Sequence, residues 1–111
     1  MANLLWIQAL CCGGETASFL NSDHPHLRAA LRNLNVTVLG HVYLQGQARG
    51  EMDQLLEECA AGKVHVDLLV VEGATQLAGE CWPMRASSRP LAERIRTIAG
   101  LADFTVAVGT C

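Results

Sequence analysis

The 111-residue sequence lacks any long apolar run, which excludes a helix that crosses a bilayer. Its longest apolar runs, such as Asp67 to Val71 and Phe104 to Val108, fall far short of the roughly 20 residues that such a helix needs. The first residues, Met1 to Trp6, contain no basic segment, twin arginine or small-residue cleavage site. We therefore expect no membrane span, no export signal and a cytoplasmic protein that reaches the inner membrane only through partners.

Charge and phosphate-binding motifs are also scarce. Only 17% of the residues are charged and the net charge is -3, which argues against nucleic acid as a partner. The stretch from Cys11 to Glu15 holds a single Gly-Gly pair, and the chain has no G-x-G-x-x-G or G-K-[ST] motif for a nucleotide. A Ser-His-Asp nucleophile elbow is absent too. These absences leave little support for nucleotide binding or acyl transfer.

Five cysteines are present, an odd number in a chain without an export signal, so a disulfide framework does not explain them. Metal binding or burial in the core must do so instead. They are Cys11, Cys12, Cys59, Cys81 and Cys111.

The chain length fits one domain, and half of the residues are apolar, as expected for a sheet covered on both faces. Runs rich in β-branched or large apolar residues predict strands at Leu4 to Ile7, Val36 to Leu44, Asp67 to Val71 and Phe104 to Val108. The stretch from Gly73 to Ser88 holds Gly, Pro and Ser and is expected to be a surface loop.

Apolar residues at helical spacing separate the strands. One such pattern runs from Leu27 to Leu34 after Pro25, and another runs from Met52 to Cys59 before Gly62, a typical helix-terminating residue. A third begins near Pro90 and ends at Gly100, with Leu91, Ile95 and Ile98 on one side. Strands that alternate with helices imply right-handed crossovers, so we predict a three-layer, flavodoxin-like α/β domain over residues 1–111 with a four-stranded parallel sheet.

In open parallel sheets, ligands bind where the carboxyl ends of the strands converge. The first strand leads into Cys11 and Cys12 followed by Gly13-Gly14, the third into Glu72, and the fourth into Gly109-Thr110-Cys111. Thiolates at one rim suit an iron-sulfur cluster, and the flanking glycines let backbone amides approach its sulfurs. The alternative is that Cys11 and Cys12 are small buried hydrophobic residues, because free cysteine is often buried.

Several segments resemble the nickel-iron hydrogenase small subunits. The segments are Leu5-Trp6-Ile7-Gln8, Thr16-Ala17-Ser18-Phe19-Leu20-Asn21, His41, Gly62-Lys63, Val66 to Gly73, Arg89-Pro90 and Ala107 to Cys111. Each is weak alone, but their order and spacing together are specific and span essentially the whole chain. The likeness is greatest to uptake-type subunits without an export signal.

In that family a 4Fe-4S cluster faces the nickel-iron site of the large subunit. The resemblance implies that Cys12 and Cys111 are the first and third cluster ligands, while Glu15 stands where the second cysteine is expected and the fourth would lie beyond residue 111. A carboxylate is a harder ligand than a thiolate, so either Glu15 or the adjacent Cys11 would complete the set here. The ligand set is incomplete, and we expect the chain to be the N-terminal part of a longer subunit.

Glu72 ends the third predicted strand, and the matching segment of the family lies near the cluster. If buried, its charged form would be disfavoured by desolvation, and it could relay protons or tune the cluster potential. The alternative is a solvated acid at a strand end.

Other chemistry-bearing residues have simpler explanations. His24 and His26 are expected to be a solvated helix entry rather than a metal site, because Pro25 separates them. Trp6 and Cys59 are expected in the core, and Cys81 near the cluster or a partner without ligating iron. Four arginines are expected on a solvated face: Arg85, Arg89, Arg94 and Arg96.

These patterns lead to one functional hypothesis with two alternatives. By resemblance, the chain is the electron-transfer subunit of a nickel-iron hydrogenase, an oxidoreductase, with the hydrogenase large subunit as its partner and no catalysis in isolation. The related 20 kDa-type subunit of NADH:quinone oxidoreductase also carries adjacent cysteines, as Cys11 and Cys12 are here. The third possibility is a cluster-free flavodoxin-like module for assembly or interaction. A surface that a large partner normally covers would make the isolated chain poorly soluble.

Overall fold

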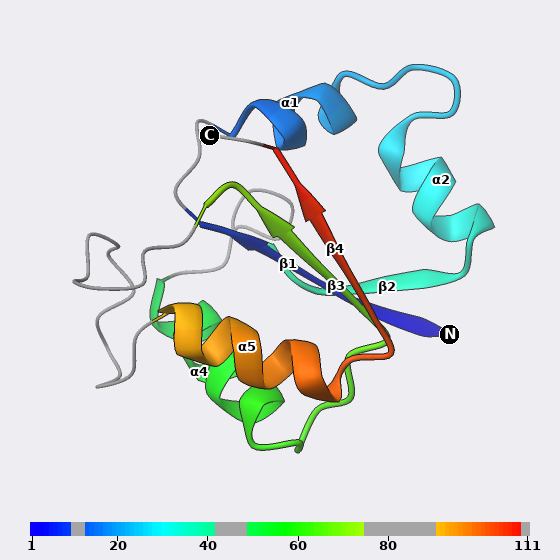
Figure 1. Ribbon diagram of the computed structural model, residues 1–111. Coiled ribbons are helices and arrows are strands. Elements are labelled where there is room, and N and C mark those ends of the chain that lie inside the picture. The colour runs from blue at the N-terminus through cyan, green and yellow to red at the C-terminus, as the bar shows by residue number, and fades with distance from the viewer. Residues whose placement is uncertain (10–12, 42–48, 75–90, 110–111) are drawn as a thin grey trace.

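The computed structural model describes residues 1–9, 13–41, 49–74 and 91–109 and contains one open parallel sheet between two helical layers (Figure 1). The strand order is β2-β1-β3-β4 and every neighbouring pair is parallel. In Figure 1, α1 and α2 lie on one side of the sheet, and α4 and α5 lie on the other. The predicted three-layer, flavodoxin-like fold is therefore confirmed.

All four predicted strands are present. They are β1 (Ala2–Gln8), β2 (Val36–Gly40), β3 (Leu68–Glu72) and β4 (Phe104–Val108). The fourth agrees with its prediction at both ends, whereas β1 is longer because Asn3 and Gln8 pair with neighbouring strands despite their polar side chains. The predicted end of the second strand at Leu44 lies outside the described residues.

Three helices confirm the apolar spacing in the sequence: α2 (Leu27–Asn33), α4 (Arg49–Ala60) and α5 (Leu91–Leu101). Gly62 follows α4 with φ of 77°, and its amide donates to the carbonyl of Cys59, which is a left-handed helix end that favours glycine. The expected surface loop from Gly73 to Ser88 is described only at residues 73 and 74, and the rest lies outside the described residues.

A further helix, α1 (Gly14–Leu20), was not predicted. Its residues, Gly-Glu-Thr-Ala-Ser-Phe-Leu, include glycine, threonine and serine, which have low helix propensity. The helix begins after Gly13, whose φ of 77° reverses the chain as it leaves the rim of the sheet. Tertiary contacts at its first turn, described below, hold this short helix in place.

The larger core lies between the sheet and the α4–α5 layer. Leu5 and Ile7 of β1 and Leu69 of β3 have no exposed surface, and they pack with Leu56 of α4 and Ile98 of α5. Cys59 is also buried in this core, as expected, and its burial raises the pKa of the thiol to about 11. The Cys59 thiol is therefore protonated at neutral pH.

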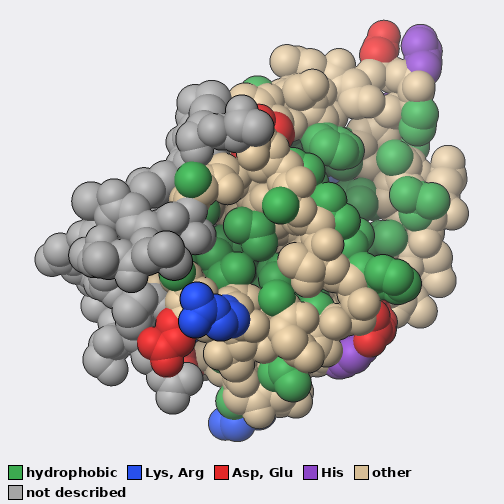
Figure 2. Space-filling model, in the orientation of Figure 1, with side chains coloured by type: hydrophobic (Ala, Val, Ile, Leu, Met, Phe, Trp, Pro, Cys, Tyr) green, Lys and Arg blue, Asp and Glu red, His purple; other side chains and the backbone are tan. Residues whose placement is uncertain are grey.

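The opposite face of the sheet is less completely covered. Leu4, Trp6 and Val70 form a smaller core with partly buried residues of α2 and β2, which confirms Trp6 as a core residue. An apolar pocket of about 260 Å³ opens beside this core, and on the outer strand β4 Phe104 remains 72% exposed. Figure 2 shows hydrophobic side chains gathered on the face that β4 presents. The helical layer of α1 and α2 thus leaves apolar surface open.

Arg94 corrects one expectation. We expected four arginines on a solvated face, but the guanidinium of Arg94 is fully buried and forms ion pairs with Asp53 and Glu57. It lies on the side of α5 that packs against α4, so the pair holds the two helices together. Arg96 is exposed, as expected, whereas Arg85 and Arg89 lie outside the described residues.

The Asp-His-Pro-His segment forms a solvated helix entry, as expected. The side chain of His24 is 94% exposed, and the ring of His26 accepts the amide of Ala29 at the start of α2. Within the described ranges, no helix is long and apolar enough to cross a membrane.

Candidate functional site

The carboxyl ends of β1 and β3 meet the first turn of α1 around the carboxylate of Glu72. Trp6, Gln8 and Glu72 lie on the same face of the sheet because side chains alternate along each strand. Thr16, on the first turn of α1, lies above them and is only 3% exposed. Residues that are distant in sequence therefore build one buried polar cluster at this rim.

Glu72 is fully buried and accepts hydrogen bonds from Trp6 and Thr16. The indole Nε1 of Trp6 donates to Oε2 at 3.0 Å, the hydroxyl of Thr16 donates to Oε2 at 2.6 Å, and the backbone amide of Thr16 donates to Oε1 at 3.1 Å. The amide is one of those that the first turn of a helix leaves without an intrahelical partner. Glu72 therefore satisfies the start of α1 and ties it to the sheet.

The charge state of Glu72 differs from our expectation. Burial raises the pKa of this carboxyl, but the hydrogen bonds from Thr16, Trp6 and Gln8 outweigh burial and leave the pKa below its ordinary value. The burial of Glu72 excludes the solvated alternative, but the expectation that burial would disfavour its charged form was wrong, because hydrogen-bond donors replace the water that burial removes. Glu72 is a carboxylate at neutral pH.

The hydroxyl of Thr16 links this carboxylate to His41. Because its single proton goes to Glu72, its lone pairs accept from the amide of Gln8 at 3.1 Å and from Nε2 of His41 at 3.2 Å. The hydrogen-bond network thus assigns a proton to Nε2 of His41. The result is a chain of hydrogen bonds from an imidazole through a hydroxyl to a carboxylate.

His41 directly follows β2 and has no exposed surface. Its ring packs against Trp6 with 5.5 Å between ring centroids, and Trp6 also contacts Phe19 of α1 edge to face. Burial lowers the pKa of His41, against the opposing effect of the Glu72 charge. The imidazole is therefore neutral at neutral pH, so the cluster carries the single negative charge of Glu72.

Glu15 lies beside the end of β4. A Cβ built on Gly109 would come within 2.6 Å of Glu15 Oε1, so a larger residue at this position would push the Glu15 carboxylate aside. The φ of Gly109 is 81°, a second reason for glycine. Oε2 of Glu15 is buried and has no hydrogen-bond partner among the described residues. A buried carboxylate oxygen without a hydrogen-bond donor does not stabilise the fold, but its lone pairs can bind a metal ion.

This approach brings the α1 start close to the segment that leads to Cys111. Cys12 precedes Gly13 by one residue and Cys111 follows Gly109 by two, and a chain advances at most about 3.8 Å per residue. Among the described residues, the Glu15 carboxylate is a donor at this rim that could contribute to an iron-sulfur cluster. Cys11, Cys12, Cys81 and Cys111 themselves lie outside the described residues, so their roles stay predictions.

The sequence did not single out Thr16 or His41 as functional residues. Both occur in the segments that resemble the hydrogenase subunits, but nothing in their spacing indicated that a residue of α1 and one after β2 meet at Glu72. The signal was topological: both positions lie at the same rim of the predicted sheet as Glu72.

The chain was compared with known families and structures. The model of the family described as NADH ubiquinone oxidoreductase, 20 Kd subunit, matches residues 12–111. The actinobacterial-type NiFe-hydrogenase from Ralstonia eutropha H16 has a similar fold, with a TM-score of 0.72 and 21% identity over 99% of this chain. The match covers 36% of the hydrogenase chain, so the present chain spans about a third of that relative. No curated protein matches.

Proposed function

Because the chain belongs to the family of the 20 Kd subunit of NADH ubiquinone oxidoreductase, we propose that it is the cluster-bearing part of an electron-transfer subunit in an uptake-type nickel-iron hydrogenase. In this proposal Cys12 and Cys111 bind iron, and Glu15 or Cys11 supplies a further ligand. A bound 4Fe-4S cluster would accept one electron at a time and pass it on. The chain's own task is to position and tune that cluster.

The observation that carries this proposal is the approach of Glu15 to Gly109. The carboxylate lies three residues after Cys12, and Gly109 lies two residues before Cys111. In this proposal Glu15 binds iron through Oε2, the oxygen that has no hydrogen-bond partner among the described residues. An oxygen ligand in place of a thiolate is expected to weaken the hold on that iron and to change the potential.

Glu72 supports the same role because it holds the helix turn that carries Glu15. Its carboxylate fixes the first turn of α1, which carries Glu15, through the amide and hydroxyl of Thr16. With a cluster bound at this rim, the negative charge of Glu72 would favour the oxidised form of the cluster. The arrangement of His41, Thr16 and Glu72 also offers a path along which a proton could move with the electron.

The proposed partner is a hydrogenase large subunit, which would cleave hydrogen, and the location is the cytoplasm. The similar structure is a NiFe-hydrogenase, and the exposed apolar side chains on β4 suit a chain that further protein covers. The family description favours a second candidate, the 20 Kd subunit of NADH ubiquinone oxidoreductase, in which Cys11 and Cys12 would both face the cluster. The identity of the co-purified partner subunit separates the two.

Anaerobic reconstitution with iron and sulfide tests the ligand assignment. Absorption and electron paramagnetic resonance spectra of the full chain, alone and with a large subunit, measure cluster occupancy. We expect Cys12→Ser and Cys111→Ser to abolish the cluster signal, Glu15→Ala to reduce it, and Glu15→Cys to increase it because the cysteine adds a thiolate.

The matched control is Cys59→Ala, which removes a thiol from the core between the sheet and α4. This variant should retain the wild-type signal. If wild-type protein with its large subunit shows no iron-sulfur spectrum, or if Cys59→Ala loses as much signal as Cys12→Ser, the electron-transfer assignment is wrong and the cluster-free module replaces it.

A further inference from the structure

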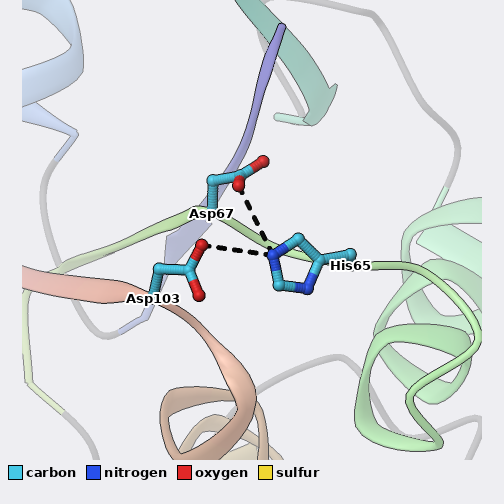
Figure 3. Close-up of side chains that lie close together, drawn as sticks. All are labelled: His65, Asp67 and Asp103. Atoms are coloured by element: carbon cyan, nitrogen blue, oxygen red, sulfur yellow. Dashed lines mark hydrogen bonds and ion pairs between the residues drawn. The ribbon is translucent and has the colours of Figure 1, made fainter.

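Three metal-binding side chains meet at the other rim of the sheet, away from Glu72. His65 and Asp67 lie directly before β3, and Asp103 lies directly before β4, so all three occupy the amino ends of neighbouring parallel strands. Figure 3 shows the two carboxylates turned toward one nitrogen of the imidazole. Nothing in the proposed cluster site involves this rim.

The distances within this group are those of a metal coordination shell. Nε2 of His65 lies 3.4 Å from Oδ1 of Asp67 and 3.2 Å from Oδ2 of Asp103. Neighbouring ligand atoms around a tetrahedral zinc ion with bonds of about 2.0 Å are separated by about 3.3 Å. One ligand atom from each of the three residues lies within 4.8 Å of the others. Two of the three separations therefore match a coordination shell, and the third is at most 4.8 Å.

Asn3 orients two of the three groups. Its backbone amide donates to Oδ2 of Asp67 at 2.7 Å, and its side-chain amide donates to the carbonyl of His65 at 3.0 Å. Backbone hydrogen bonds from Asp67 to Asn3 and from Phe104 to Asp67 fix the strand ends themselves. Because Oδ2 of Asp67 accepts the Asn3 amide, Oδ1 is left to face His65. Hydrogen bonds of this kind, outside the metal, orient the ligands of known metal sites.

Charge also favours a cation here. Asp67 places one carboxylate oxygen against Nε2 of His65. Asp103 adds a second carboxylate to the same nitrogen. The side chains of His65 and Asp103 are 59% and 52% exposed, which leaves room for water to complete a coordination shell.

We propose that His65, Asp67 and Asp103 form a binding site for a divalent transition-metal ion such as Zn²⁺, with water at the remaining positions. The ion would join the segment that enters β3 to the segment that enters β4. The site does not depend on the proposed hydrogenase role. The competing explanation is a simple ion-pair network in which His65 bridges two carboxylates without a metal.

Paramagnetic Mn²⁺ is a suitable probe because carboxylate and imidazole ligands bind it, whereas the chain's thiolates prefer softer metals. Nuclear magnetic resonance spectra of the full chain are recorded while Mn²⁺ and then diamagnetic Zn²⁺ are added. We expect Mn²⁺ to broaden the signals of His65, Asp67 and Asp103 first, and Zn²⁺ to restore them by displacing the Mn²⁺.

Asp103→Asn keeps the side-chain shape and should weaken Mn²⁺ binding about tenfold or more, as should His65→Gln in a second variant. His24→Gln is the matched control, because His24 lies 3.7 Å from Asp23 in an exposed pair with no third ligand among the residues that the structure describes. This control should bind Mn²⁺ like the wild type. Equal broadening at His24 and His65, or unchanged binding by both Asp103→Asn and His65→Gln, would overturn the proposal in favour of the ion-pair network.

Discussion

Replacement of Glu72 by glutamine tests the buried cluster at the carboxyl rim. The change keeps the size of the side chain but replaces one acceptor oxygen with an NH₂ group. Each carboxylate oxygen faces a donor in the structure, Thr16 at Oε1 and both Trp6 and Thr16 at Oε2. In either orientation, the amide of the variant therefore places a donor against a donor.

The magnitude follows from the number of bonds lost. A hydrogen bond to a charged group contributes about 1.5–3 kcal/mol, and a buried donor left without a partner is costly. The variant loses at least one such bond and weakens the others by removing the charge. We expect the free energy of unfolding to fall by about 2–4 kcal/mol, with α1 as the element that detaches first.

Urea denaturation followed by tryptophan fluorescence measures this loss, with Glu93→Gln as the control because Glu93 is exposed on α5. The control should change stability by less than about 1 kcal/mol. Because the pKa of Glu72 is lowered in the folded state, its contribution is present above the ordinary carboxyl pKa of roughly 4.3 and is lost as the pH falls through the folded pKa. The gap between wild type and variant should therefore close in acid.

A Glu72→Gln protein as stable as the control at neutral pH would refute this reasoning. So would a difference that widens as the pH falls, because that result would mean a protonated Glu72 in the folded protein.

Three further predictions concern His41, Arg94 and Gly109. Burial lowers the pKa of His41, so wild-type stability should decline as the pH falls below about 6.5, and His41→Gln should remove that part of the decline in urea titrations at several pH values. Arg94→Ala should lower the free energy of unfolding, measured by calorimetry, by about 3–5 kcal/mol because it leaves two carboxylates without their cation. The exposed control Arg96→Ala should lower it by less than about 0.5 kcal/mol. Equal losses of stability in the two variants would contradict the buried ion pair. Gly109→Ala and Gly62→Ala both place alanine at a positive φ and should each cost about 1–2 kcal/mol, but only the first displaces Glu15, so only it should reduce cluster occupancy on reconstitution.

The sequence predicted the fold well because apolar residues recur at strand or helix spacing in most elements. The agreement is complete for the strand Phe104–Val108, and it is good for the helices before Gly62 and after Pro90. It failed at α1, whose formation depends on the contact of Thr16 with Glu72 rather than on local propensity.

The site was predicted less completely, for a related reason. Spacing along the chain identified Glu72 as a rim residue, but it could not show that Thr16 and His41 converge on it or that donors keep its carboxylate charged. The buried ion pair of Arg94 was missed in the same way, since helical spacing does not reveal which charged residue faces a partner helix. Long-range polar contacts of this kind appear only once the elements are packed.

The central claim is that the segments carrying Cys12 and Cys111 meet at one rim of the sheet. Mild oxidation of the iron-free full chain, followed by peptide mapping by mass spectrometry, measures this meeting directly. The account predicts an intramolecular disulfide between Cys12 and Cys111, while Cys59 stays reduced in the core. Recovery of Cys12 and Cys111 as separate thiols, under conditions that link other cysteines of the chain, would contradict it.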